Sequence, residues 1–219
     1  MRIRRLLAAT FGLCLMARAE EAGVTPFTAA DRWKPGDAGA WEWIDGEGGA
    51  WLRLVRQSDF KPPVRSPFNL TWFEGGTWEG FELEVEARLT KFDDGNNDLC
   101  VAFAGRDDRH FYYAHLGEKA DAVHHHIHLV NDADRTPVTT WRSAGTPWKR
   151  GTWHRIRLEH RPATGEIVVR FDGEPVLKAA DKTLRGGRVG LGSFDDTGDF
   201  RRLVVRRLPP DADAPGALP

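Results

Sequence analysis

The chain has 219 residues and a formal net charge of −1, so its size suits one medium domain with a substantial core. The first nineteen residues hold four arginines and no acidic residue, and without them the net charge moves from −1 to −5. This mild acidity argues against nucleic acid or an anionic membrane surface as partner, because both are bound mainly through cationic patches.

The N-terminus has the form of a secretory signal peptide over residues 1–19. Three early arginines precede the apolar run LLAATFGLCLM, and the small-x-small triplet ARA ends just before Glu20. The run is too short to cross a bilayer, so we expect a secreted or periplasmic protein without membrane insertion. Cleavage removes Cys14 and leaves Cys100 without a disulfide partner. In LCVAFAG, Cys100 is favoured as a small buried hydrophobe over a reactive thiol.

Short alternating or apolar segments follow one another along the chain and predict β-strands. PATGE at 162–166 and DG at 172–173 have the composition of hairpin turns. No long helical stripe interrupts the pattern, so we predict an antiparallel sandwich or barrel. We expect a lead-in segment at 20–39, one domain over 40–208 and a disordered tail at 209–219. The predicted strands are 51–57, 81–89, 99–105, 111–116, 125–131, 153–161, 166–173 and 202–208.

The strand FELEVEARL places three glutamates and an arginine on one face, namely Glu82, Glu84, Glu86 and Arg88. Paired carboxylates on a sheet are the machinery of glycoside hydrolases. A retaining pair needs its carboxyl groups about 5 to 5.5 Å apart, however, and Cα atoms four residues apart on a strand are separated by about 13 Å. A solvated face is therefore the favoured interpretation, and catalysis stays open.

Six of the nine tryptophans lie between residues 33 and 78. Exposed indoles would suit a sugar-binding surface, but a sandwich without disulfides needs large core residues. We assign most tryptophans to the core and keep Trp72 and Trp141 as surface candidates.

Six of the eight histidines fall between residues 110 and 131. In a strand, His124, His126 and His128 share one face, whereas His125 lies on the other. Imidazoles at this spacing can chelate zinc or copper, yet no cysteine or glutamate stands at partner spacing in the run. The alternatives are solvated or stacked side chains and catalytic use.

His115 is the stronger candidate, because it follows Tyr113 on one face of FYYAHL. Pairing of this strand with HHIHLVN through GEKADAV would bring His115 near His124–His126. A Tyr and a His can act as proton donor and acceptor in a polysaccharide lyase, with Arg88 or Lys119 neutralising a uronate carboxylate. The structural alternative is a hydrogen-bonded histidine that holds the GEKADA loop.

Two acidic loops, FDDGNND at 92–98 and SFDDTGD at 193–199, offer oxygen ligands for a candidate structural calcium ion. Asp195 and Asp196 are its expected ligands. Turn chemistry explains Asp, Asn and Gly equally well.

The second half of the chain resembles the C-terminal half of a concanavalin A-like (laminin-G-like) jelly roll. The motifs are WH at 153–154, FDG at 171–173 and GRVGLGSF at 187–194. NDLCVAFAGRDDRHFYYAHLGEKADA, IHLVNDADRTPV and GSFDDTG resemble a group of exported bacterial proteins of this fold with YYxHL and GSFDDTG motifs and no settled activity. The resemblance covers residues 40 to 205.

The resemblance implies a two-sheet antiparallel jelly-roll sandwich of the concanavalin A-like lectin/glucanase type, with one concave face that often holds carbohydrate. The histidine of YYxHL maps onto His115, and the one before I-x-x-V-N maps onto His125. The sequence departs from the pattern at Val123, His126 and His128, where His, Asn and Phe are expected.

Three functions stay open. The first is a carbohydrate-recognition module that binds a polysaccharide or glycan. The second is a glycan-cleaving lyase or hydrolase, and the third is a laminin-G-like protein-interaction domain. For an enzyme, the catalytic candidates are Tyr113, His115, His125 and His126. The substrate-binding candidates are Glu84, Glu86, Arg88, Lys119 and Trp141.

Overall fold

The computed structural model describes residues 27, 29–91 and 95–209. Apart from two short 3-10 turns, η1 (Ala30–Arg32) and η2 (Ala38–Ala40), its regular elements are β-strands. The strands are β1 (Trp33–Pro35), β2 (Trp41–Ile44), β3 (Trp51–Leu54), β4 (Asn69–Phe73), β5 (Trp78–Glu79), β6 (Phe81–Leu89), β7 (Asp98–Asp107), β8 (His110–Gly117), β9 (His126–Asn131), β10 (Thr136–Pro137), β11 (Thr139–Arg142), β12 (His154–Arg161), β13 (Glu166–Phe171), β14 (Glu174–Ala180), β15 (Gly186–Ser193) and β16 (Gly198–Arg207).

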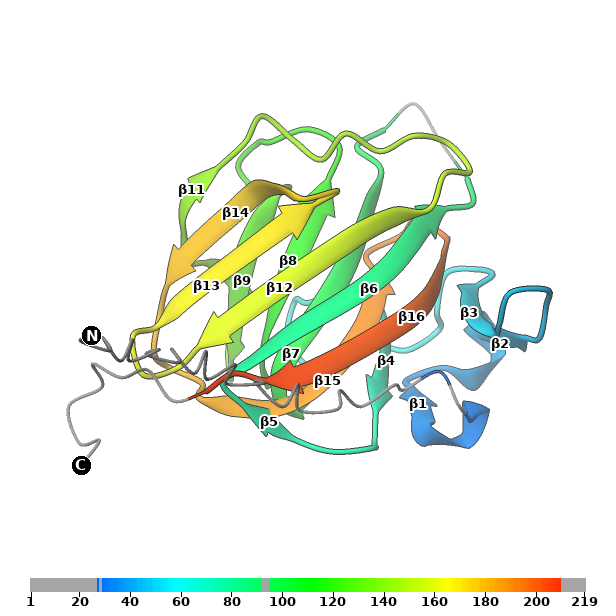
Figure 1. Cartoon of the computed structure of the whole chain (residues 1–219), viewed down its shortest axis with the longest axis horizontal. Helices are drawn as coiled ribbons and strands as arrows, with labels where there is room; N and C mark the ends of the chain where they lie inside the picture. The colour runs from blue at the N-terminus through cyan, green and yellow to red at the C-terminus, as the bar shows by residue number, and fades with distance from the viewer. Residues whose placement is uncertain (1–26, 28, 92–94, 210–219) are drawn as a thin grey trace, which may run out of the picture.

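The strands form two antiparallel sheets stacked face to face (Figure 1). The first sheet, nearer the viewer in Figure 1, has the order β11-β14-β13-β12-β6-β16-β3-β2. The second has the order β1-β4-β15-β7-β8-β9-β10, and β5 pairs with β15. The chain is thus an all-β, two-sheet antiparallel jelly-roll sandwich, and the predicted fold class is confirmed.

All eight predicted strands coincide with observed strands, and both predicted hairpins connect neighbours, β12 with β13 and β13 with β14. β1 lies inside the expected lead-in segment, where Trp33 is buried and pairs with Phe73 of β4. The expected signal peptide, and the expected tail after Pro209, lie outside the described residues. Among the residues with described structure, no helix has the length and apolar character to cross a membrane.

The main core lies between the sheets. In β6 burial alternates strictly, with Phe81, Leu83 and Val85 facing inward and the glutamates facing out. This is the pattern of a sheet with one packed and one solvated face. The outer face of the first sheet is therefore the accessible one.

The second sheet is covered on both faces. Its outer face carries a separate buried cluster: Leu70, Trp72, Cys100, Ala102, Phe111, Tyr113, Val130 and Phe194. Val64 and Phe68 pack against this cluster. The backbone N–H of Arg65 donates to the carboxylate of Asp134, and the carbonyl oxygen of Arg65 accepts from the backbone N–H of Arg135. The segment before β4 therefore closes this face to solvent.

Trp72, expected as a surface candidate, is buried. Glycines make room for its indole: a Cβ on Gly105 would lie 2.4 Å from Trp72 Cζ3, and one on Gly190 would lie 2.8 Å from Cε3. The expectation was wrong because it did not include the neighbouring strands. Their glycines leave the space in which the indole packs.

Candidate functional site

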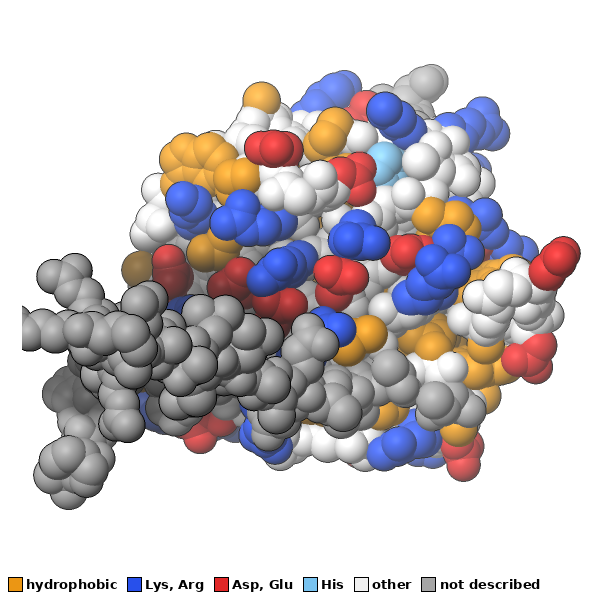
Figure 2. Space-filling view, in the orientation of Figure 1, with side chains coloured by type: hydrophobic (Ala, Val, Ile, Leu, Met, Phe, Trp, Pro, Cys, Tyr) orange, Lys and Arg blue, Asp and Glu red, His pale blue; other side chains and the backbone are white. Residues whose placement is uncertain are grey.

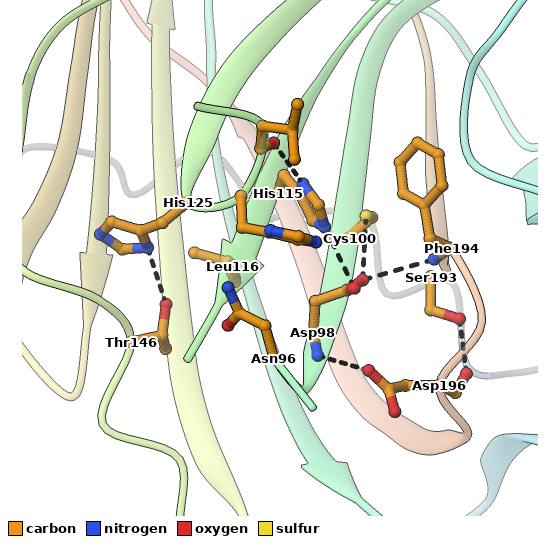
Figure 3. A network of polar contacts seen from close by, with 12 residues as sticks. Asn96, Asp98, Cys100, His115, Leu116, His125, Thr146, Ser193, Phe194 and Asp196 are labelled. Atoms are coloured by element: carbon orange, nitrogen blue, oxygen red, sulfur yellow. Dashed lines mark hydrogen bonds and ion pairs between the residues drawn. The ribbon is translucent and has the colours of Figure 1, made fainter. Parts of the chain in front are cut away.

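Three buried side chains with different donor atoms converge on the outer face of the second sheet. Asp98 and Cys100 are two residues apart on β7 and share a face, and His115 of β8 pairs directly with Cys100. Their ligand atoms lie within 4.8 Å of one another, and each residue is at most 1% exposed. Figure 3 shows the imidazole of His115 pointing toward Asp98 and Cys100.

The hydrogen bonds of His115 define its proton arrangement. Nδ1 lies 3.1 Å from the carbonyl oxygen of Val123, which can only accept, so Nδ1 carries a proton. Nε2 lies 3.1 Å from Asp98 Oδ2 but has no hydrogen-bond partner. The Asp98 carboxylate is oriented in turn by the backbone N–H of Phe194, which donates to Oδ1.

Tyr113 and His128 lie beside this group. Their rings stack with centroids 5.0 Å apart, and Arg135 donates to the Tyr113 hydroxyl at 3.3 Å while its guanidinium lies over Phe194. Burial raises the pKa of Tyr113 well above its usual value, and burial lowers the pKa of His128 to about 2. Both side chains are therefore neutral at physiological pH.

The predicted approach of the histidine run to His115 is confirmed. His126 pairs with His115 across β8 and β9, and the rings of His115 and His124 have centroids 5.3 Å apart. His126 and His128 share a face as expected. Of the alternatives for the run, the solvated one is wrong for His128, which is buried and stacked on Tyr113, and its Nε2 lies 3.1 Å from the carbonyl oxygen of Val123.

His125 belongs to a different environment. Its backbone has φ of 60°, so the chain turns just before β9, and the ring points away from His115 toward Thr146 (Figure 3). Nδ1 contacts Thr146 Oγ1 at 3.1 Å and Nε2 contacts Ser143 Oγ at 3.0 Å. Burial lowers its pKa to about 4. His125 thus fastens two loops, and a catalytic role for it stays a prediction.

The predicted thiol environment of Cys100 is confirmed, since the side chain is buried. Burial, assisted by the negative charge of Asp98, raises the pKa of the thiol well above its usual value. In this state the group is neutral and a poor nucleophile.

Asp195 and Asp196 lie next to the same carboxylate. Their oxygens and those of Asp98 are within 4.8 Å of one another, and Asp196 Oδ2 accepts the backbone N–H of Asp98. Oxygen donors of this kind suit calcium. Residues 92–94 of the other acidic loop lie outside the described residues. The calcium site stays a prediction.

A second candidate, open to solvent, lies on the outer face of the first sheet. A groove of about 850 Å³ runs over β13, β12, β6 and β16. Figure 2 shows acidic and basic side chains interleaved on this face. The groove is lined by Glu84, Glu86, Trp153, Arg155, Arg157, Glu159, Arg170, Asp172, Gly173 and Arg201.

Strand register explains the interleaving, because Glu84 stands opposite Arg157, and Glu86 stands opposite both Arg155 and Arg201. Glu86 accepts from Arg201 Nε at 2.7 Å. Burial opposes ionisation of Glu86, but hydrogen bonds and charge from Arg201 and Arg202 outweigh it and hold its pKa below the usual value. The predicted glutamate face is therefore confirmed, and Glu82, Glu84 and Glu86 each have an arginine partner on it.

The remaining predicted substrate-binding residues are spread over the surface. Arg88 pairs with buried Asp199 and lies over Trp153, which lines the groove. Lys119 is exposed in the loop after β8. Trp141 on the edge strand β11 is 46% exposed, which confirms it as a surface residue. Of the predicted set, Glu84 and Glu86 line the groove together, and Arg88 contacts the lining residue Trp153.

Sequence reasoning missed Asp98 and the groove arginines. Asp98 was treated as part of an acidic turn, although the spacing Asp-x-Cys in a strand places both side chains on one face. The partnership of Glu86 with Arg155 and Arg201 depends on pairing between strands far apart in sequence, for which the sequence carries no local signal.

A scan against models of known protein families finds no match. Among solved structures, the chain is similar to a carbohydrate binding module, CBM66 from Bacillus subtilis, with a TM-score of 0.58 and 16% identity over 80% of this chain and 95% of that chain. It is also similar to the carbohydrate recognition domain of Emp46p in its metal-free form, with a TM-score of 0.54 and 11% identity over 85% of this chain and 96% of that chain. A third similar structure is a Bacillus subtilis protein of unknown function with a galectin-like fold, with a TM-score of 0.51 and 13% identity over 86% of this chain and 97% of that chain. These likenesses concern the fold.

Proposed function

We propose that this protein is a carbohydrate-recognition β-sandwich and that a neutral glycan binds in the groove over β12, β6 and β16. The observation that carries the proposal is the groove itself: an open hollow of about 850 Å³ lined by donors and acceptors in alternation and by the indole of Trp153. Sugar hydroxyls both donate and accept, so they match such a lining better than an apolar ligand does.

The charge balance of the groove defines the class of glycan. Four carboxylates and four guanidinium groups are among its lining residues, so the lining is neutral overall. A polyanion such as a uronate polymer needs a net positive surface, as nucleic acids do. A neutral polysaccharide has no such requirement, and its binding is expected to depend little on salt.

The same pairing favours recognition over cleavage in the groove. A glycoside hydrolase needs one carboxyl group that is protonated and able to donate. Glu86 is held ionised by two arginines, and Glu82 and Glu84 also have arginine partners. Tyr113 and His115, the basis of the lyase alternative, lie on the other sheet and are buried, with 0% and 1% of their surface exposed.

The fold neighbours support this proposal, since two of them carry carbohydrate binding or recognition in their own names. A secreted or periplasmic location, which we expect from the first nineteen residues, would bring the protein to extracellular polysaccharides.

The test is a binding panel of neutral and uronate-containing polysaccharides, with reducing ends and unsaturated products measured in parallel. We expect retention of at least one neutral polymer without new ends, little changed between low and high salt. Cleavage that His115→Ala abolishes would support the lyase alternative instead. Failure to bind any polymer would contradict the proposal and favour a laminin-G-like protein-interaction domain.

A further inference from the structure

We propose that Asp98, Cys100 and His115 form a binding site for a divalent transition-metal ion of the zinc class. The proposal is independent of the glycan groove, which lies on the other sheet. It begins with topology: an i, i+2 pair on β7 and the residue directly opposite on β8 place a carboxylate, a thiol and an imidazole on one face.

The unpartnered nitrogen of His115 points to a cation. With the proton on Nδ1, a neutral ring presents a lone pair at Nε2. This lone pair faces the carboxylate oxygen Asp98 Oδ2 at 3.1 Å, in a place where both side chains are at most 2% exposed. Two acceptors facing each other in the absence of water are unfavourable, and a metal ion that both can bind removes the conflict.

The surroundings resemble those that orient metal ligands in general. A metal-binding histidine commonly donates its other ring N–H to a backbone carbonyl, as His115 does to Val123. The Asp98 carboxylate is held by the N–H of Phe194 through Oδ1, which leaves Oδ2 directed at the ring. Cys100 Sγ lies 3.9 Å from Asp98 Oδ1, so the thiol borders the same space.

The donor set selects the metal class. Calcium and magnesium take oxygen ligands, whereas zinc accepts sulfur, nitrogen and carboxylate oxygen together. Three protein ligands leave a fourth position for water or the second oxygen of Asp98. The acidic group of Asp195 and Asp196 shares Asp98 with this site but offers oxygen donors alone, so it lacks the nitrogen and sulfur ligands that favour zinc.

The experiment uses the full chain without a polyhistidine tag, produced in minimal medium with cobalt so that the metal is present as the protein folds. We expect about one cobalt ion per chain and a sulfur-to-cobalt charge-transfer band. Cys100→Ser should remove the band, and His115→Gln should reduce bound cobalt by at least about tenfold, since even outer-shell partners of metal ligands matter that much.

His124→Gln and Asp195→Asn serve as matched controls, because they remove a neighbouring half-buried histidine and a nearby carboxylate; both should keep the band. The proposal is overturned if folded wild-type protein holds no stoichiometric cobalt, or if the band survives Cys100→Ser. Where a variant fails to fold, the wild-type metal content and spectrum decide. Glycan binding is measured on the same samples. It tests the groove separately, whether or not cobalt is bound.

Discussion

Asp98 Oδ2 and His115 Nε2 lie 3.1 Å apart in a buried layer, and no hydrogen bond joins them. Either His115 is protonated there, or the contact is a repulsive one that a metal relieves. The two states respond in opposite ways to loss of the negative charge.

Asp98→Asn separates these states in metal-free protein. The new amide can donate to the bare Nε2 and still accept from Phe194, so it replaces a repulsive contact with a hydrogen bond, and we expect stability to rise by about 1 kcal/mol. Urea unfolding at pH 7 measures it. A loss of about 3 to 5 kcal/mol would instead indicate a buried ion pair that has lost one partner.

His160 makes the free energy of unfolding depend on pH. It is buried among Phe81, Phe103 and Tyr112, neither ring nitrogen has a partner, and burial lowers its pKa from 6.5 to about 4. The unfolded chain therefore takes up a proton first as the pH falls below 6.5, and stability falls by up to about 1.4 kcal/mol per pH unit until the folded pKa is reached.

His160→Leu should remove this contribution and, because no polar atom is left unpaired, raise stability at pH 7 by about 1 kcal/mol. Urea unfolding at pH 7, 6 and 5 should show a shallower decline than in wild type. His110→Gln is the control, since His110 is half-buried beside Asp107 and its replacement leaves the core unchanged. An unchanged slope in His160→Leu would contradict the assignment.

Asp199 binds two arginines from neighbouring strands. Its fully buried carboxylate lies 2.7 Å from Arg53 Nε and 2.7 Å from Arg88 Nη2. Asp199→Asn should cost about 1.5 to 3 kcal/mol, because the hydrogen bonds from the two arginines lose their charged acceptor. Glu79→Gln breaks an exposed pair with Arg185 and should cost less than about 1 kcal/mol. Chemical denaturation measures both losses. Equal losses of unfolding free energy in Asp199→Asn and Glu79→Gln would show that burial does not determine how much an ion pair contributes to stability.

Gly105 supplies the space for the Trp72 indole. Gly105→Ala should destabilise the fold by about 1 to 3 kcal/mol through overpacking. Gly95→Ala is its control, since a Cβ there meets nothing within 4 Å. Thermal melting of the two variants compares them, and matching melting temperatures would mean that the indole moves aside freely.

Much of the fold follows from local pattern. FELEVEARL alternates strictly and forms β6 as predicted, and the turns at 162–166 and 172–173 join the predicted hairpin strands. Other strands carry no such signal: β4, NLTWF, is buried at every position, and β15, GGRVGLGS, is rich in glycine. The resemblance to concanavalin A-like jelly rolls drew on GRVGLGSF in this region, whereas periodicity predicted no strand there.

The site was predictable only in part. Antiparallel pairing across the GEKADAV loop brought His115 to His126 as expected, because the loop is short. The burial of this face depends on Val64 and Phe68, which reach it from a segment without strand periodicity. Packing of a distant segment onto a sheet face cannot be recognised from the local sequence pattern.

The central claim is that the groove holds a neutral glycan, and native affinity electrophoresis in gels containing the polysaccharide retained in the panel tests it most directly. Trp153→Ala removes the groove indole, and Trp141→Ala removes an exposed indole outside it. We predict that wild type and Trp141→Ala are retarded and that Trp153→Ala migrates as in a gel without polysaccharide. Equal retardation of wild type and Trp153→Ala would contradict the account, and loss of retardation in Trp141→Ala alone would move the binding surface to β11.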